Sequence, residues 1–245
     1  MKYIIKSKSP FEFEQWKEQY QLTEEDLENS PEIVNWKNLS GKEKTAVWEK
    51  LSGDDKKSVK KSLLQEQGYI CCYCQKEIEV NKFTIIEHLE SRKTSPIKMF
   101  NYDNMLACCD GGDEDRANES VKNIPKAQRT PVYCGAKKDN SSLPISPLDT
   151  QCENHFKYIK VVSPDNNNKS LVIIQSDTNE GKDAIRILNL DNKSLREMRG
   201  EFIDGFIQGI SKEEIEELLP IIKNKKEDGH FFPFCIAIET ILKTL

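Results

Sequence analysis

Several cysteines in the middle of the chain are spaced to bind one metal ion. Cys71 and Cys74 are separated by two residues, and such a pair forms a tight turn that aims both thiolates at a tetrahedral ion such as zinc. A second pair must come from Cys108, Cys109 and Cys134. We expect Cys109 and Cys134, because Cys134 precedes a glycine and Cys108, one residue back on an expected helix, would point about 100° away. Four thiolates leave no open coordination position, so this zinc would be structural. The alternative is a set of buried free cysteines.

A carboxylate and a histidine, Glu87 and His88, follow the cysteine pair at the end of a hydrophobic stretch. Histidine can take a proton from water because its ordinary pKa of ~6.5 lies near neutral pH. A neighbouring carboxylate can bind Mg²⁺, which prefers oxygen ligands. Adjacent residues of a strand point to opposite faces, so both side chains reach one phosphate only if the strand ends or bulges at Glu87. The pair predicts phosphodiester hydrolysis, and the alternative is a histidine satisfied in the core.

Positive charge concentrates after the cysteine pair, although the net charge of the chain is −5. Six basic residues between positions 116 and 138 stand against Glu119 alone: Arg116, Lys122, Lys126, Arg129, Lys137 and Lys138. The net charge argues against a free-standing nucleic-acid-binding protein, whereas this segment alone carries +5 and the remainder −10. We expect phosphate contacts from Arg92, Lys93, Lys137 and Lys138. The alternative is a solvated charged face.

The elements that must position these residues divide the chain into three segments. Residues 1–66 are expected to be helical, 67–150 to form a zinc-stabilised finger, and 151–245 to be mainly helical. In the first segment apolar residues recur every three or four positions, and Ser30 before Pro31 is typical of a helix start. A further helix over 57–67 should end at Gly68. The expected fold class is therefore α+β, a mainly helical chain with a small central β element.

The central segment should supply the strands next to Glu87. Residues 77–80 and 83–86 predict a hairpin through Asn81, residues 103–107 the start of a short helix, and residues 110–130 a long loop. In the last segment, residues 156–162 and 171–174 predict a second hairpin that turns at 164–168. Helical spacing follows over 183–190, 194–210, 212–223 and 234–245, with Ser211 as an N-cap.

Composition excludes several classes of protein. The 245 residues are 37% hydrophobic and 31% charged, and no apolar run approaches the ~18 residues of a membrane span. The N-terminus lacks the apolar core of a signal peptide, so we expect a cytoplasmic protein with no membrane partner. Six of the eight cysteines cluster in one third of the sequence, which favours zinc over a secreted disulfide scaffold. Cys152 and Cys235 lie apart and are expected to be buried.

Together these residues resemble the HNH endonucleases. The resemblance is carried by Glu87-His88, Asn104 and Cys134-Gly-Ala-Lys-Lys, framed by Cys71-x-x-Cys74 and Cys109. It implies a ββα-metal finger in which His88 is the general base and Glu87 binds the catalytic ion, Mg²⁺ or another divalent cation. Asn104 would tie the loop of the finger to its helix. The implied reaction cuts nucleic acid with a single ion and leaves 5′-phosphate and 3′-hydroxyl ends.

One position departs from the family pattern. Many members carry an asparagine or histidine as a second metal ligand just after the last cysteine, where this chain has Gly135. Candidate substitutes are Asp110, Asp139 and Asn140.

The resemblance extends beyond the finger to the HNH subunits of Septu and retron-associated anti-phage systems, the PtuB family. It is carried by residues 64–74, Ile145-Ser-Pro-Leu, residues 152–158 and residues 188–195. It implies a DNA substrate, a partner ATPase of the PtuA type and a retron RNA–DNA element. The competing hypotheses are a zinc-stabilised module that binds nucleic acid or protein without cutting, and a toxin-like nuclease held by an inhibitor. Glu87-His88 favours an enzyme, because a binding module has no use for an acid–base pair.

Overall fold

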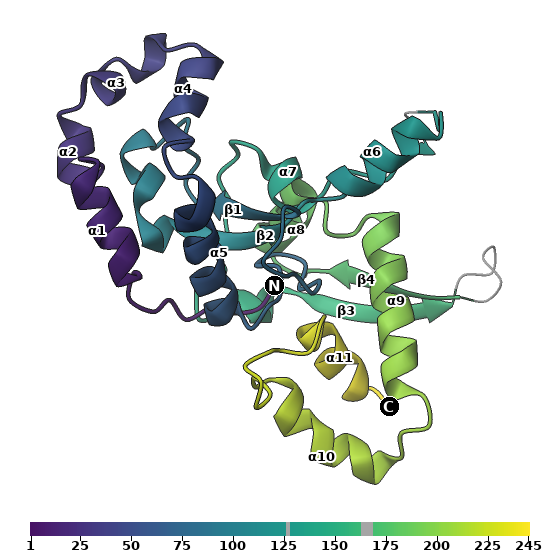
Figure 1. The fold of residues 1–245 in the computed structure, drawn as a ribbon. Coiled ribbons are helices and arrows are strands. Elements are labelled where there is room, and N and C mark those ends of the chain that lie inside the picture. The colour runs from purple at the N-terminus through teal and green to yellow at the C-terminus, as the bar shows by residue number, and fades with distance from the viewer. Residues whose placement is uncertain (126–127, 163–168) are drawn as a thin grey trace.

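Two small antiparallel sheets lie among helices in the computed structural model of the chain, which describes residues 1–125, 128–162 and 169–245 (Figure 1). One sheet pairs β1 with β2, and the other pairs β3 with β4. This mixture of helices and small sheets confirms the expected α+β class.

The N-terminal segment is helical, as its apolar spacing predicted. Its elements are α1 (Phe11–Gln19), α2 (Glu24–Glu28), α3 (Pro31–Val34), the 3₁₀ turn η1 (Trp36–Asn38), α4 (Gly41–Trp48) and α5 (Gly53–Gln67). Ser30 caps α3 by accepting the Ile33 N–H, and α5 ends at Gly68, whose φ of +58° suits glycine. We call residues 11–48 the arm, which curves along one side of the molecule (Figure 1).

The central sheet differs from the predicted hairpin. β1 (Thr84–His88) pairs with β2 (Met105–Cys109), so that Thr84 lies opposite Cys109 and His88 opposite Met105. The hairpin predicted over 77–80 and 83–86 is therefore wrong, because the partner of β1 lies across a long connection that contains η2 (Pro96–Phe100) and η3 (Tyr102–Asn104). The helix predicted at 103–107 is also wrong. β2 is buried at all five positions, and a short run of that kind has no periodicity to separate strand from helix.

The segment between Cys109 and Cys134, which we call the excursion, leaves the core and returns to it close to where it began. It contains α6 (Asp113–Val121), which corrects the predicted loop and which projects from the body of the molecule (Figure 1). Three acidic residues in its first turn favour a helix N-terminus. The Tyr133 N–H donates to the Gly111 carbonyl over 3.2 Å and closes the base of the excursion. The chain thus returns at α7 (Cys134–Lys138) beside the strand that it left.

The C-terminal segment forms its predicted hairpin and helices. It contains η5 (Cys152–His155), β3 (Lys157–Val162), β4 (Ser170–Gln175), α8 (Asn179–Leu188), α9 (Lys193–Ile207), α10 (Lys212–Ile222) and α11 (Cys235–Leu242). Ser211 caps α10 as expected. The turn predicted at 164–168 lies outside the described residues, as does Lys126 of the basic segment. α9 packs on β4 and α11 on β3.

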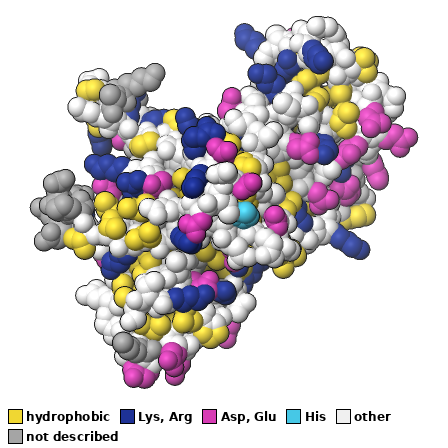
Figure 2. All heavy atoms as spheres, turned by 180° about the vertical axis from the view of Figure 1, so that it is seen from behind, with side chains coloured by type: hydrophobic (Ala, Val, Ile, Leu, Met, Phe, Trp, Pro, Cys, Tyr) yellow, Lys and Arg dark blue, Asp and Glu magenta, His cyan; other side chains and the backbone are white. Residues whose placement is uncertain are grey.

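Buried residues from all three segments join in one core. The C-terminal segment also holds the turn that follows α5: the Phe231 N–H donates to the Gly68 carbonyl over 2.9 Å, and the Phe234 N–H donates to that of Gln75 over 3.0 Å. Cys152 and Cys235 are buried, as predicted. None of the described helices combines the length and apolar character that crossing a membrane requires. On the rear face, acidic side chains gather over the arm (Figure 2).

Candidate metal centre and adjoining cavity

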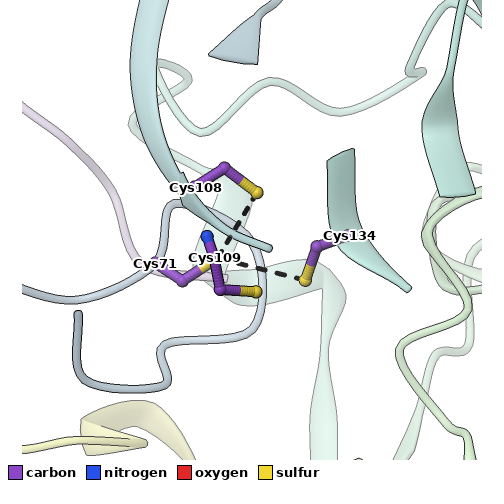
Figure 3. A group of neighbouring side chains, drawn as sticks. All are labelled: Cys71, Cys108, Cys109 and Cys134. Atoms are coloured by element: carbon purple, nitrogen blue, oxygen red, sulfur yellow. Dashed lines mark hydrogen bonds between the residues drawn. The ribbon is translucent and has the colours of Figure 1, made fainter. Parts of the chain in front are cut away.

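Four cysteine sulfurs converge on one point (Figure 3). The Sγ atoms of Cys71, Cys108, Cys109 and Cys134 all lie within 4.8 Å of one another. The Sγ of Cys71 is 3.7 Å from that of Cys108 and 3.9 Å from that of Cys134. A Zn–S bond of about 2.3 Å gives a tetrahedron with an edge of about 3.8 Å. The cluster therefore has the size and donor chemistry of a zinc–thiolate site.

A fifth thiol, that of Cys74, adjoins this cluster. Its Sγ lies 3.9 Å from the Sγ of Cys109 and accepts the Lys76 N–H over 3.5 Å. Cys108 does not point away from the cluster as expected, because it lies on a strand and not on a helix. Five thiols thus surround a site that takes four, and Cys71, Cys109 and Cys134 belong to both possible sets.

The pKa values of the buried thiols indicate that they can ionise together only if a cation lies between them. Burial raises the pKa of Cys74, Cys108 and Cys134 well above the ordinary value. Burial also acts to raise the pKa of Cys71, but hydrogen bonds from neighbouring thiols hold it well below that value. Several thiolates cannot coexist here without a positive ion, since each would repel the others in a medium of low polarity. Zinc binding would supply that charge and release protons.

Gln67 joins α5 to two of the chain segments that carry cysteines of the cluster. Its Nε2 donates to the carbonyls of Ile70 (3.0 Å) and Ala107 (2.8 Å), and its Oε1 accepts the Ala107 N–H (2.7 Å). This buried amide was not among the residues predicted from the sequence. Its burial could have been predicted from its position, because Val59, Leu63 and Gln67 follow one another at four-residue steps on the buried face of α5.

A cavity of about 760 Å³ next to the cysteine cluster contains both Glu87 and His88. The strand does not end at Glu87, since β1 continues through His88 and the two side chains alternate across it. Both nevertheless line the same cavity, together with Arg92, Lys93 and Cys108. The structure therefore brings the predicted acid–base pair together with two of the basic residues expected to contact nucleic acid.

His88 is held as a neutral base. Its Nε2 lies 2.9 Å from the Met99 carbonyl, and a carbonyl only accepts, so Nε2 carries the proton and Nδ1 keeps a free lone pair. Burial lowers the pKa of His88 to about 3, away from the near-neutral value that the sequence led us to expect, and the charges of Arg92 and Lys138 act in the same direction. Trp48 of α4 meets the imidazole edge-on, with ring centroids 4.8 Å apart. The arm thus orients His88, a role that the sequence did not reveal.

Glu87 is fixed by two buried neighbours. Its Oε1 lies 2.9 Å from Lys138 Nζ and accepts the Tyr73 hydroxyl over 3.1 Å. Burial raises the pKa of Glu87, although Lys138 and Tyr73 oppose this effect. Lys138 is only 1% exposed and also donates to the His88 carbonyl over 2.8 Å. Its ammonium therefore positions the acid–base pair and is not presented to solvent as a phosphate contact would be, whereas Lys137 is exposed.

Gly135 makes room for the Glu87 carboxylate. A Cβ at this position would lie 2.6 Å from Glu87 Oε2 and 3.3 Å from Cys108 Sγ. Any side chain here, including the asparagine or histidine of the family pattern, would displace one of those groups. The departure at Gly135 is therefore part of how this chain places Glu87.

We expect Gly135→Ala to lower the rate of cleavage about a hundredfold, because a displacement of about 1 Å in a reacting group has this order of effect. The rate should be measured on a plasmid substrate, alongside zinc content and thermal unfolding. Gly205→Ala is the matched control, since its Cβ would meet nothing within 4 Å. Equal rates for the two variants would contradict the role given to Gly135.

Asn104 braces the connection between β1 and β2. Its Nδ2 donates to the carbonyls of Glu90 (3.0 Å) and Lys98 (3.1 Å), and its Oδ1 accepts the Glu90 N–H (2.8 Å). Since the same connection carries Met99, which accepts from His88, Asn104 acts on the site through the backbone. It is absent from the lining of the cavity.

Side chains with oxygen donors also line the cavity. Asp110, Asp139 and Asn140, the candidate substitutes for the second metal ligand, line it with Glu87. Within the described residues, the cysteine cluster is the one group of three or more His, Cys, Asp or Glu side chains that converges closely enough for a metal. A single carboxylate such as Glu87 is still compatible with Mg²⁺, which binds proteins through one or two carboxylates and keeps several waters.

Comparison with known proteins gives one informative relative. No protein-family model matches the chain. Over 179 aligned residues the chain is 27% identical to "Retron Vc95 putative HNH endonuclease" of Vibrio cholerae serotype O1 biovar El Tor. The alignment covers 70% of this chain and 70% of that protein. The chain is thus similar to a retron protein described as a nuclease, and this similarity supports its resemblance to the HNH endonuclease family.

Proposed function

We propose that this chain is a metal-dependent HNH endonuclease that hydrolyses phosphodiester bonds in DNA. The observation that carries the proposal is that Glu87 and His88 line one cavity, while the hydrogen bond from His88 Nε2 to the Met99 carbonyl leaves Nδ1 with its lone pair. The cysteine cluster beside it is suited to structural zinc, and β1, β2 and α7 would form the ββα-metal finger.

In this mechanism His88 Nδ1 accepts a proton from a water molecule. The water oxygen forms a bond to phosphorus as the bond from phosphorus to the 3′ oxygen breaks. The 3′ oxygen takes up a proton from solvent, which leaves a 3′-hydroxyl and a 5′-phosphate. A divalent ion, when held by Glu87 and oxygen ligands of the cavity, supplies a Lewis acid for the negative charge of this step. Lys138 and Tyr73 keep the Glu87 carboxylate in place.

We infer further that the chain works in an anti-phage complex with a PtuA-type ATPase, associated with a retron RNA–DNA element. Two observations support this inference. The relative is described as a retron protein. Residues 11–35 of the arm carry eight acidic residues against Lys17 alone, a surface that repels DNA and suits a basic protein partner.

The test is a cleavage assay on the chain and on the complex recovered with it from its native operon. We expect Mg²⁺- or Mn²⁺-dependent cutting of plasmid DNA, lost at least a hundredfold in Glu87→Gln because the neutral amide binds a cation poorly. Glu90→Gln is the control, since Glu90 is exposed and pairs with Lys98 outside the cavity. Metal-independent cutting, or DNA binding without cutting by both preparations, would contradict the proposal; the second result would favour a non-catalytic zinc module.

A further inference from the structure

The arm supplies a second wall of the cavity. Trp36 of η1 and three residues of α4, namely Gly41, Lys44 and Thr45, line the same space as Glu87 and His88. More than forty residues of sequence separate these two parts of the lining, yet they share one cavity. Neither the family resemblance nor the relative gives the arm a role.

Charge is divided along the N-terminal segment. Residues 11–35 carry eight acidic residues and one lysine, whereas residues 36–61 carry eight lysines and four acidic residues. The change of sign falls at Trp36, where the chain reaches the cavity. The basic half therefore includes the part of the segment that lines the reacting groups, and the acidic half precedes it.

Three positive groups of the cavity lining form no ion pair within the described residues, although four carboxylates line the same cavity: those of Glu87, Asp110, Asp113 and Asp139. Lys44, Arg92 and Lys93 have no carboxylate within ion-pair distance among the described residues. Lys44 Nζ instead lies 5.7 Å from the ring centroid of Trp36, and the Arg92 guanidinium lies 4.8 Å from that of Trp48. Cations held over aromatic faces keep their N–H groups available for an anion.

Trp36, which lines the cavity, carries a buried donor without a partner. It is only 5% exposed, and its Nε1 has no hydrogen-bond partner among the described residues. A buried indole N–H without a partner costs free energy, and buried tryptophans usually have one. Because this Nε1 is itself buried, a phosphate oxygen next to Lys44 would accept from it once the indole ring turns toward the cavity.

We propose that η1 and α4 form a backbone-binding wall that holds the DNA strand next to the scissile phosphate, with Lys44 and Trp36 as positioning residues. The inference rests on the proposed nuclease function and adds where the substrate strand lies. Trp48 links the wall to the chemistry, because its ring contacts both the His88 imidazole and the Arg92 guanidinium. The wall thereby fixes the position of the DNA strand relative to His88.

The test compares Lys44→Ala with Lys50→Ala in the full chain. Lys50 follows the same helix but is exposed and does not line the cavity. In Mg²⁺-free buffer, with the His88→Ala substitution present, we expect Lys44→Ala to weaken binding of a labelled DNA oligonucleotide about tenfold and to lower the salt dependence by about one phosphate contact. Duplex and single-stranded probes, used in parallel, identify which form the wall holds. Lys50→Ala should change neither quantity.

With His88 intact, Lys44→Ala and Trp36→Phe should each raise KM about fivefold to tenfold and change kcat less than twofold, because uniform binding is lost and the chemistry is not. Trp36→Phe removes the N–H and keeps the ring, and thermal unfolding checks that each variant is folded. Identical binding and KM for Lys44→Ala and Lys50→Ala would overturn the proposed wall even if the protein cuts DNA. Lys44-dependent binding by a protein that never cuts would instead leave the wall standing and remove the nuclease function.

Discussion

Replacing His88 with alanine should abolish DNA cleavage while the zinc content of the protein stays at one ion per chain. General base catalysis contributes about 10²–10⁴ in rate, so a fall of at least that size is expected. Within the described residues the imidazole makes no hydrogen bond to a cysteine of the cluster, since its hydrogen bond goes to the Met99 carbonyl. Cleavage of plasmid DNA and metal analysis of the purified protein measure the two quantities. His155→Ala is the control, because His155 bonds Thr178 and neither residue lines the cavity. Normal cutting by His88→Ala would remove the catalytic assignment.

The same variant should change how stability depends on pH. The pKa of His88 is about 3 in the folded protein and ~6.5 when the chain is unfolded, so the unfolded state binds more protons in acid. The contribution of the neutral imidazole is fully present above pH ~6.5 and is lost as the pH falls toward the folded pKa. Between pH 7 and pH 4.5 we expect wild type to lose about 2–3 kcal/mol more unfolding free energy than His88→Ala. Denaturant titrations at several pH values measure this difference, and parallel pH profiles would contradict it.

Loss of zinc should unfold the central part of the protein. Structural zinc contributes about 10–16 kcal/mol of apparent binding energy in small metal-bound units, and whole domains are stable by only about 5–15 kcal/mol. We therefore expect Cys71→Ser, Cys109→Ser or Cys134→Ser to give insoluble or unfolded protein. A chelator should have the same effect on the wild type, measured by circular dichroism. Cys152→Ala is the control, since Cys152 is buried outside the cluster.

Cys74 and Cys108 are the two candidates for the fourth ligand of a zinc ion in this cluster. Cys74 is the ligand that the Cys-x-x-Cys spacing predicts, whereas the Sγ of Cys108 lies within 4.8 Å of all three shared ligands. Zinc analysis of Cys74→Ser and Cys108→Ser decides between them, because only the true ligand is needed for stoichiometric binding. Purified wild-type protein without any metal would contradict both sets.

Local signals were enough for most helices. Ser30, Gly68 and Ser211 mark helix ends through caps that need no tertiary contact, and the structure places helix ends at all three. They failed at β2, where five consecutive buried residues suit a buried strand and a core helix equally. They also failed at α6, whose sparse apolar residues resemble those of a loop although its acidic first turn favours a helix.

The site was predictable in its chemistry and not in its supports. Glu87 and His88 are recognisable from residue type, and the structure places both in one cavity. The groups that hold them come from distant segments: Lys138 from α7, Trp48 from α4 and the Met99 carbonyl from the connection between the strands. No spacing rule connects these positions, because only the folded chain brings them together. Lys138 was expected to contact phosphate because it belongs to a basic run, but charge alone does not determine burial and its side chain is buried.

The distance along the chain between Cys71 and Cys134, 63 residues, has a consequence for how the protein is made. A growing polypeptide can complete its metal site only after residue 134 has left the ribosome, long after α1 to α5 have emerged. The early helices can form from local contacts, whereas the cluster must wait for a distant segment and then pay the entropy of closing a long loop. During that interval several thiols are exposed together. The time between synthesis of the first and the last ligand is thus when the chain is most open to oxidation and aggregation.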